Sequence, residues 1–121
     1  MPLSFKKTYT FQQRKDEALR TLQHQPDHIP LVCEKEENSD IVAVNRCKLL
    51  VPKVLLVGQL LHVLRSRLKL PSEKAIFILI NDEVPSNSSP LSTVYDVHKD
   101  EDGFLYIKFM GENAFGLSKE N

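Results

Sequence analysis

The sequence predicts a two-layer α+β domain, in which a four-stranded sheet packs on one central helix behind an N-terminal helical extension. Apolar side chains recur at helical intervals between Val57 and Leu68, which predicts the central helix. The unbroken apolar run Ala75–Ile80 and the alternating segment Phe104–Met110 predict two of the strands. A chain of 121 residues, 41% of them hydrophobic, has the size and composition of one such domain.

The N-terminal extension is predicted to hold a helix that begins near Thr10 and ends before Pro26. Thr10 and Gln13 have the spacing of a capping box, in which two side chains bond the free backbone groups that open a helix. One apolar stripe should face the core, and the charged residues should lie off it. The stripe contains Phe11, Ala18, Leu19 and Leu22, and the charged residues are Arg14, Lys15, Asp16, Glu17 and Arg20. The preceding segment, Leu3–Lys7, is either a further helical turn or a mobile arm.

Two short strands are expected next. The first is Ile29–Glu34, and Pro30 restricts it because proline has no backbone N–H to donate. This strand must therefore either lie at a sheet edge or begin its pairing after Pro30. Polar residues 36–40 make the connection to a second strand, Lys48–Val51, which ends at Pro52.

A buried strand and a short helix follow the central helix. Because Ala75–Ile80 is apolar throughout, we expect it to be well buried, and Asn81–Glu83 supplies a turn. Ser89 is the expected N-cap of a short helix that has Pro90 at its first position and runs to about Val97.

The last strand follows a turn at Asp100–Gly103 and places alternate side chains on opposite faces of the sheet. One face has Phe104, Tyr106 and Lys108, and the other has Leu105, Ile107 and Phe109. If this strand lies parallel to the first strand at the centre of the sheet, the topology is the ubiquitin-like β-grasp. Periodicity supports the elements but does not supply that strand order.

Composition excludes several classes of function. The chain has 16 basic and 16 acidic side chains, so no electrostatic argument favours nucleic acid or an anionic membrane surface as a partner. The longest apolar run, Ala75–Ile80, is far shorter than the roughly 20 residues that span a bilayer. The segment Met1–Lys7 lacks the apolar stretch of a secretory signal, so the cytoplasm is the expected compartment.

No catalytic, metal or cofactor site is predicted. Cys33 and Cys47 lack zinc-knuckle spacing and are expected to be free, buried thiols. His24 and His28 have the spacing of a helical zinc pair, but Pro26 lies between them and breaks the helix. The acidic run Asp100–Asp102 lacks the spacing of a calcium loop and is expected to be a solvated turn.

Several stretches between about Phe5 and Gly116 have a specific order and spacing. They are Pro26–Pro30, Glu34–Lys35, Lys48–Pro52, Val57–Gln59, Arg65–Arg67, Ala75–Phe77, Phe104–Ile107 and Glu112–Gly116. Together they resemble the autophagy ubiquitin-like modifiers, the family of the microtubule-associated protein light chains and the GABA-receptor-associated proteins. The resemblance implies a β-grasp domain with a four-stranded mixed sheet over residues 28–116. It also implies an N-terminal helical extension over 1–27 and a tail, 117–121, that is removed on processing.

By this resemblance Gly116 is the residue of cleavage and conjugation. A dedicated cysteine protease would cut after it, activating and conjugating enzymes would carry it as a thioester, and phosphatidylethanolamine would accept it. Glycine suits this chemistry because the missing side chain lets the tail enter a narrow channel and leaves the acyl carbon open. Gly116 is then a substrate and the chain is not an enzyme. Lipidation would move it from the cytoplasm to the autophagosome membrane, with later delivery to the vacuole or lysosome lumen.

The resemblance also implies two pockets for cargo receptors and adaptors that carry motifs of the form aromatic, two residues, aliphatic. The first pocket would be lined by Glu17, Thr21, Pro30, Lys48, Leu50 and Phe104, with Arg46 at its rim. The second would use Leu49, Val51, Pro52, Leu55, Leu60, Val63 and Arg67. The edge from Lys48 to Leu50 would pair with the ligand as an added strand. Alternatively, the apolar members are core residues and the cations are solvated surface.

Some positions depart from the family pattern. Thr21 replaces an aliphatic residue in the first pocket, and smaller groups line the second, so ligand preference is open at both. Leu56 stands where a threonine would cap the central helix, which should weaken the helix start by about 1 kcal/mol unless another group substitutes. A second hypothesis keeps the pockets without conjugation, as an unconjugated interaction adaptor in vesicle trafficking or cytoskeletal attachment. A third, a small hydrolase, would use Cys33, Cys47 or a histidine.

Overall fold

The computed structural model describes residues 4–37, 39, 46–70 and 75–111. In chain order the elements are α1 (Phe5–Thr8), α2 (Phe11–His24), β1 (His28–Lys35), β2 (Arg46–Pro52), α3 (Val57–Arg67), β3 (Ile76–Leu79), α4 (Leu91–His98) and β4 (Leu105–Gly111). The described strands form one mixed sheet in the order β2-β1-β4-β3. β1 and β4 are parallel neighbours at its centre, and both outer pairs are antiparallel. The condition for the β-grasp topology is therefore met, and the predicted fold is confirmed.

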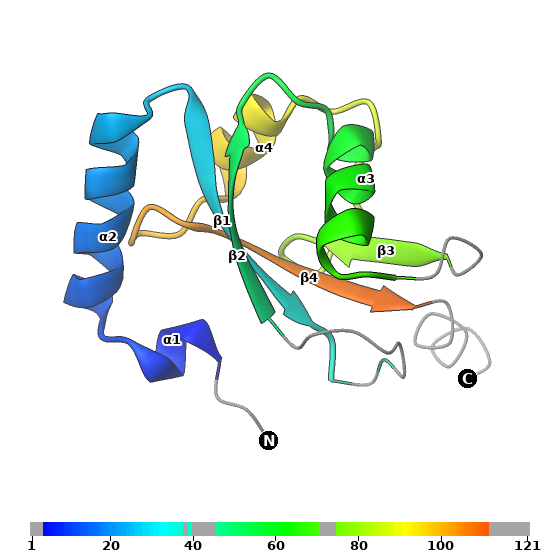
Figure 1. Ribbon diagram of the computed structural model, residues 1–121, viewed down its shortest axis with the longest axis horizontal. Coiled ribbons are helices and arrows are strands. Elements are labelled where there is room, and N and C mark those ends of the chain that lie inside the picture. Colours follow the sequence, from blue (N-terminus) through cyan, green and yellow to red (C-terminus); the bar gives the residue numbers. More distant parts are fainter. Residues whose placement is uncertain (1–3, 38, 40–45, 71–74, 112–121) are drawn as a thin grey trace.

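The sheet lies between α1 and α2 on one side and α3 and α4 on the other (Figure 1). Two groups of buried side chains pack on its two faces. The main core lies on the side of α3 and α4, and we call the smaller group under α1 and α2 the N-terminal core. The main core includes Ile29, Leu31, Leu49, Val51, Leu60, Leu64, Ile78, Leu105, Ile107 and Phe109. The N-terminal core contains Phe5, Ala18, Val32 and Phe104, with Tyr106 partly buried against them. The predicted alternation along the last strand is confirmed by this division.

The predicted start of α2 is confirmed, but its predicted apolar face is only partly right. Thr10 and Gln13 form both hydrogen bonds of the capping box. Within α2, which the structure describes in full, the buried residues are Arg14 and Ala18. Phe11 is 41% exposed. Ala18 is buried as predicted, but Arg14 is also buried on the contact face, and Leu19 is exposed like Phe11. The segment before α2 forms one helical turn, α1, and Phe5 packs into the N-terminal core.

Two expectations about strand position need correction. β1 is an inner strand, so the edge alternative for Pro30 is wrong. Pro30 is aligned with Leu50 of β2, while pairing with β4 begins at Leu31, after the proline. β3 is an edge strand whose burial alternates, with Ile76 and Ile78 buried and the residues between and after them half-buried. Its apolar character therefore does not indicate burial on both faces.

The central helix α3 is capped by a loop, in place of a side chain at Leu56. Leu56 has no side-chain cap, and its backbone N–H donates to Gln59 Oε1 at 2.8 Å. The first two helical amides donate to the carbonyls of Ser89 and Asn87, each at 2.9 Å. These carbonyls accept the hydrogen bonds of the free helix-start amides, and they therefore replace the missing side-chain cap at residue 56. The prediction that Ser89 is the N-cap of α4 is wrong. Pro90 occupies the N-cap position, and no side chain caps the helix there.

We predict that Gly103→Ala destabilises the fold by about 1–3 kcal/mol, because residue 103 has a backbone conformation that L-residues rarely adopt. Its φ is 96°, and an added Cβ would lie 3.0 Å from the Ala18 side chain. Urea unfolding monitored by circular dichroism measures the loss. Gly58→Ala is the matched control: its added Cβ meets Asn87 at 3.4 Å in a helix, where alanine is favoured over glycine by up to about 1 kcal/mol. Equal effects of the two changes would contradict the prediction.

Candidate functional site

The free edge of the described sheet on the β2 side has outward-facing backbone groups at Lys48 and Leu50. Lys53 N donates to Asp27 O at 2.9 Å, just beyond the last aligned pair of β1 and β2. Hydrogen-bonded and non-hydrogen-bonded pairs alternate along an antiparallel ladder. Odd-numbered residues of β2 therefore bond β1, and the N–H and C=O groups of Lys48 and Leu50 point away from the sheet. An extended peptide can pair with such an edge.

The predicted first pocket lies beside this edge, on the face that carries α2. Leu50 is aligned with Pro30, and the Lys48 ammonium forms an ion pair with the Glu17 carboxylate of α2. Pro30 and Phe104 are buried, whereas Glu17, Thr21, Leu50 and Arg46 are half-buried and Lys48 is exposed. The buried members can form only the floor of a pocket. The Glu17–Lys48 ion pair would lie at the rim of this predicted pocket.

Sequence reasoning missed Phe5, which supports this region from beneath. Its ring lies 5.2 Å from that of Phe104, edge to face. The Arg46 guanidinium and the Lys48 ammonium lie 5.7 and 5.9 Å from its ring centroid, within the range of cation–π attraction. Phe5 is 3% exposed, and its backbone N–H donates to Glu34 at 2.9 Å. An aromatic residue in a short N-terminal segment was the available signal, but nothing in the sequence assigned it a partner.

The residues of the predicted second pocket divide into core and surface. Leu49, Val51 and Leu60 belong to the main core and are at most 6% exposed. Leu55 and Val63 are half-buried, and Pro52 and Arg67 are exposed. Only these last four present substantial surface beside β2 and α3. Their role as a second pocket stays a prediction.

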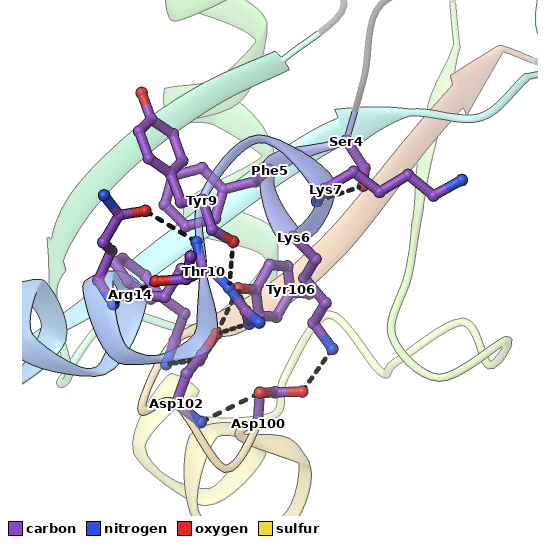
Figure 2. A network of polar contacts seen from close by, with 12 residues as sticks. Ser4, Phe5, Lys6, Lys7, Tyr9, Thr10, Arg14, Asp100, Asp102 and Tyr106 are labelled. Carbon is purple, nitrogen blue, oxygen red and sulfur yellow. Dashed lines mark hydrogen bonds and ion pairs between the residues drawn. The ribbon is translucent and has the colours of Figure 1, made fainter.

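A buried carboxylate, Asp102, organises the region between α2 and β4 (Figure 2). Its Oδ1 accepts a hydrogen bond from Phe104 N at 2.8 Å. Its Oδ2 accepts from Arg14 Nη1 and from the Tyr106 hydroxyl, each at 2.5 Å. Asp102 is 1% exposed, so the expectation of a solvated acidic turn is wrong for this residue. No local pattern indicates this burial, because Arg14 is 88 positions away from Asp102 in the chain.

The hydrogen bonds of this network keep Tyr106 protonated and Arg14 charged. Burial and the hydrogen bond to Asp102 raise the pKa of Tyr106 well above its usual value, so the hydroxyl keeps the proton that it donates. Burial alone would lower the pKa of Arg14, but its bonds to Tyr106 and Asp102 raise it overall. The guanidinium therefore stays charged. Removing one partner of such a buried pair typically costs about 3–5 kcal/mol, because the other charge is left uncompensated.

The chain leaves the described part of the sheet at Gly111. Its N–H donates to the Ser39 hydroxyl at 2.9 Å in a buried position, and it is aligned with Ile76 of β3 on its other side. Both neighbours fix the end of β4. Gly116 and the tail 117–121 lie outside the described residues, so the structure does not test the predicted site of cleavage and conjugation.

The cysteines lie directly opposite one another in β1 and β2, and both are free thiols. Cys33 is buried and Cys47 half-buried, and burial raises the pKa of each. Over the described ranges, no hydrogen bond joins either thiol to a histidine, and no cluster of three or more metal-ligating side chains occurs. Nor is any helix in those ranges long and apolar enough to cross a membrane.

Comparisons with known proteins agree with this geometry. The family model described as "Autophagy protein Atg8 ubiquitin like" matches residues 13–116. Autophagy-related protein 8 of Scheffersomyces stipitis is 51% identical over 119 residues, covering 98% of this chain and 86% of that protein. Autophagy-related protein 8 of Eremothecium gossypii is 51% identical over 118 residues, covering 98% of each. The crystal structure of Trypanosoma brucei ATG8 matches with a TM-score of 0.86 and 44% identity, covering 93% of this chain and 97% of that one.

We predict that both thiols react slowly in the native protein at neutral pH, because the raised pKa values of Cys33 and Cys47 leave little thiolate. Cys47 should react first and faster as pH rises, and Cys33 only on unfolding. Labelling with an aromatic disulfide reagent, followed by mass spectrometry, measures both rates. The Cys33→Ala and Cys47→Ala variants assign the two phases. Reaction of both sites at the rate of free cysteine would contradict the prediction.

Proposed function

The chain belongs to the Atg8 family of ubiquitin-like autophagy proteins, and from this premise we propose that it is conjugated through Gly116 to phosphatidylethanolamine. The observation that carries the proposal is the extent of the family match, which runs through β4 and ends at Gly116. Leu117–Asn121 then form a short segment to be removed. We accordingly divide the chain into an N-terminal extension, 1–27, a β-grasp domain, 28–116, and the tail, 117–121.

The described end of the sheet supports this assignment. Ser39 and β3 hold Gly111, and the segment 112–116 follows it in the sequence. Fully extended, that segment reaches at most about 18 Å. A processing cysteine protease and the activating and conjugating enzymes must therefore approach the same end of the domain. Gly116 is the substrate of these enzymes, and the chain itself is no catalyst.

The proposed chemistry also implies where the protein lies in the cell before and after conjugation. Before processing it is cytoplasmic, and the lipid provides the membrane attachment that its balanced charge does not favour. Once joined to phosphatidylethanolamine it resides on the autophagosome membrane. It then reaches the lumen of the vacuole or lysosome with the delivered contents.

The edge of β2 is proposed to bind cargo receptors and adaptors that carry aromatic-x-x-aliphatic motifs. Its support is the outward backbone of Lys48 and Leu50 beside a half-buried apolar surface over Phe104. Arg46 and Lys48 offer positive charge to acidic residues that flank such a motif. An interface of this size suits micromolar affinity, about −8 kcal/mol. Binding of this kind does not need Gly116, so an unconjugated adaptor is the competing function.

We predict that the protein from starved cells loses Leu117–Asn121 and then gains the mass of the lipid, because only a terminal glycine carboxylate can enter the proposed transfer. Intact-mass spectrometry follows both steps. Gly116→Ala should abolish them, whereas Leu117→Ala, which keeps the glycine, should not. Wild-type protein that retains its full tail and no lipid would show that conjugation is wrong and favour the unconjugated adaptor.

We predict that Lys48→Glu combined with Leu50→Ala weakens binding of an acidic aromatic-x-x-leucine peptide at least about tenfold, or 1.4 kcal/mol. The first change places two carboxylates opposite each other at Glu17, and the second removes apolar surface beside the peptide edge. Calorimetry measures the affinity. Lys108→Glu is the matched control, because the Lys108 side chain is 54% exposed, like the 51% of Lys48, and pairs instead with Glu36. Unchanged binding of the double variant would place the ligand elsewhere.

A further inference from the structure

The proposed first pocket has its floor at Phe104 and one wall on α2, and a single carboxylate bonds to both of these distant parts of the chain. Phe104, in the floor, donates its backbone N–H to Asp102 Oδ1 at 2.8 Å. Arg14, in the α2 wall, donates to Asp102 Oδ2 at 2.5 Å (Figure 2). The Asp102 side chain itself is fully buried. It therefore bonds to the floor and to the α2 wall, and it cannot touch a ligand in the pocket.

The helix α2 rests on the turn before β4 through both of its buried residues. Arg14 binds Asp102, and Ala18 lies against Gly103, where an added Cβ would come within 3.0 Å. Toward β2 the helix is joined by the Glu17–Lys48 ion pair, whose side chains are 34% and 51% exposed. Exposed pairs of this kind contribute little, about 0–1 kcal/mol. The contacts of α2 with the turn at 100–103, together with the packing of Ala18 in the N-terminal core, therefore set the distance of α2 from the sheet.

The same helix face carries the pocket residues. Arg14, Glu17 and Thr21 are spaced three and four residues apart, so they line one side of α2. A displacement of Arg14 must carry Glu17 and Thr21 with it, because a helix moves as a rigid unit over this length. Tyr106 adds a second bond to the Asp102 oxygen that holds Arg14. Its hydroxyl also lies 3.4 Å from Arg14 Nη1.

We propose that Asp102, assisted by Tyr106, is a positioning residue that sets the width of the first pocket. The width in turn determines the affinity of the pocket for the aromatic side chain of a bound motif. The proposal rests on the motif binding proposed above. The ligand class is an extended peptide with an aromatic anchor. Asp102 acts on it only through Phe104 and α2. The aliphatic anchor lies beyond this influence, because the half-buried Leu55 and Val63 and the exposed Arg67 of the proposed second pocket lie on the α3 side of the sheet.

A double-mutant cycle between protein and peptide tests this assignment. The probe is a synthetic acidic peptide with tryptophan and leucine at the two anchor positions, compared with versions that have alanine at one anchor. Replacing the tryptophan by alanine lowers the affinity of each protein by some factor. In Asp102→Asn and in Tyr106→Phe this factor should be at least about threefold smaller than in wild type. Replacing the leucine should cost the same in all proteins. Calorimetry on the full chain gives every affinity.

The two peptide positions separate positioning from mere loss of stability. A partly unfolded variant would weaken all peptides by the same factor and show coupling to neither anchor. Tyr106→Phe keeps the Arg14–Asp102 ion pair and serves if Asp102→Asn fails to fold. Asp96→Asn, the same change on an exposed part of α4, is the control and should couple to neither position.

Each outcome has a distinct meaning. If wild type binds the alanine-for-tryptophan peptide as well as the parent, the proposed motif binding itself fails. If wild type depends on tryptophan but neither variant shows coupling, Asp102 does not position the pocket and only this inference is overturned. Equal coupling to both anchors would also overturn it, since the effect would then not be confined to the first pocket.

Discussion

The N-terminal extension meets the sheet around one buried carboxylate that accepts hydrogen bonds from three donors. Asp102 takes hydrogen bonds from a guanidinium, a phenol and a backbone amide, and these offset the cost of removing its charge from water. The small N-terminal core around Phe5 and Phe104 adds a limited apolar area to the same contact. The hydrogen bonds of Asp102 and the packing of the N-terminal core together set where α2 lies, and the shape of the proposed peptide-binding surface depends on that position.

The edge of β2 has unpaired backbone groups, and it also has a charged side chain that limits unwanted association. Unpaired strand edges invite association with other chains, and charged side chains such as Lys48 commonly limit it. Here the charge is shared with Glu17 of α2, so the edge is covered by an exposed ion pair that a ligand's own carboxylates can compete with.

Periodicity and local signals predicted most of the elements, since they depend on residues close in sequence. The capping box at Thr10, the helix from Val57 and the last strand are examples. Arg14 and Asp102 could not be recognised, because each looks solvent-exposed until the other is placed beside it. Family resemblance supplied the pocket residues as a set, but it did not separate the buried Leu60 from the exposed Arg67. The strand order, likewise, came from long-range pairing that no local pattern contains.

The start of α3 depends on main-chain carbonyls of the loop 87–89, and this has an evolutionary consequence. A cap made by a side chain is lost by one substitution, whereas a cap made by the backbone survives changes of residue type. What it does not survive is a change in spacing, because an inserted or deleted residue moves the carbonyls away from the helix. Residue types in this loop should therefore be able to change, whereas its length should not. Homologous loops should differ in amino-acid type far more than in number of residues.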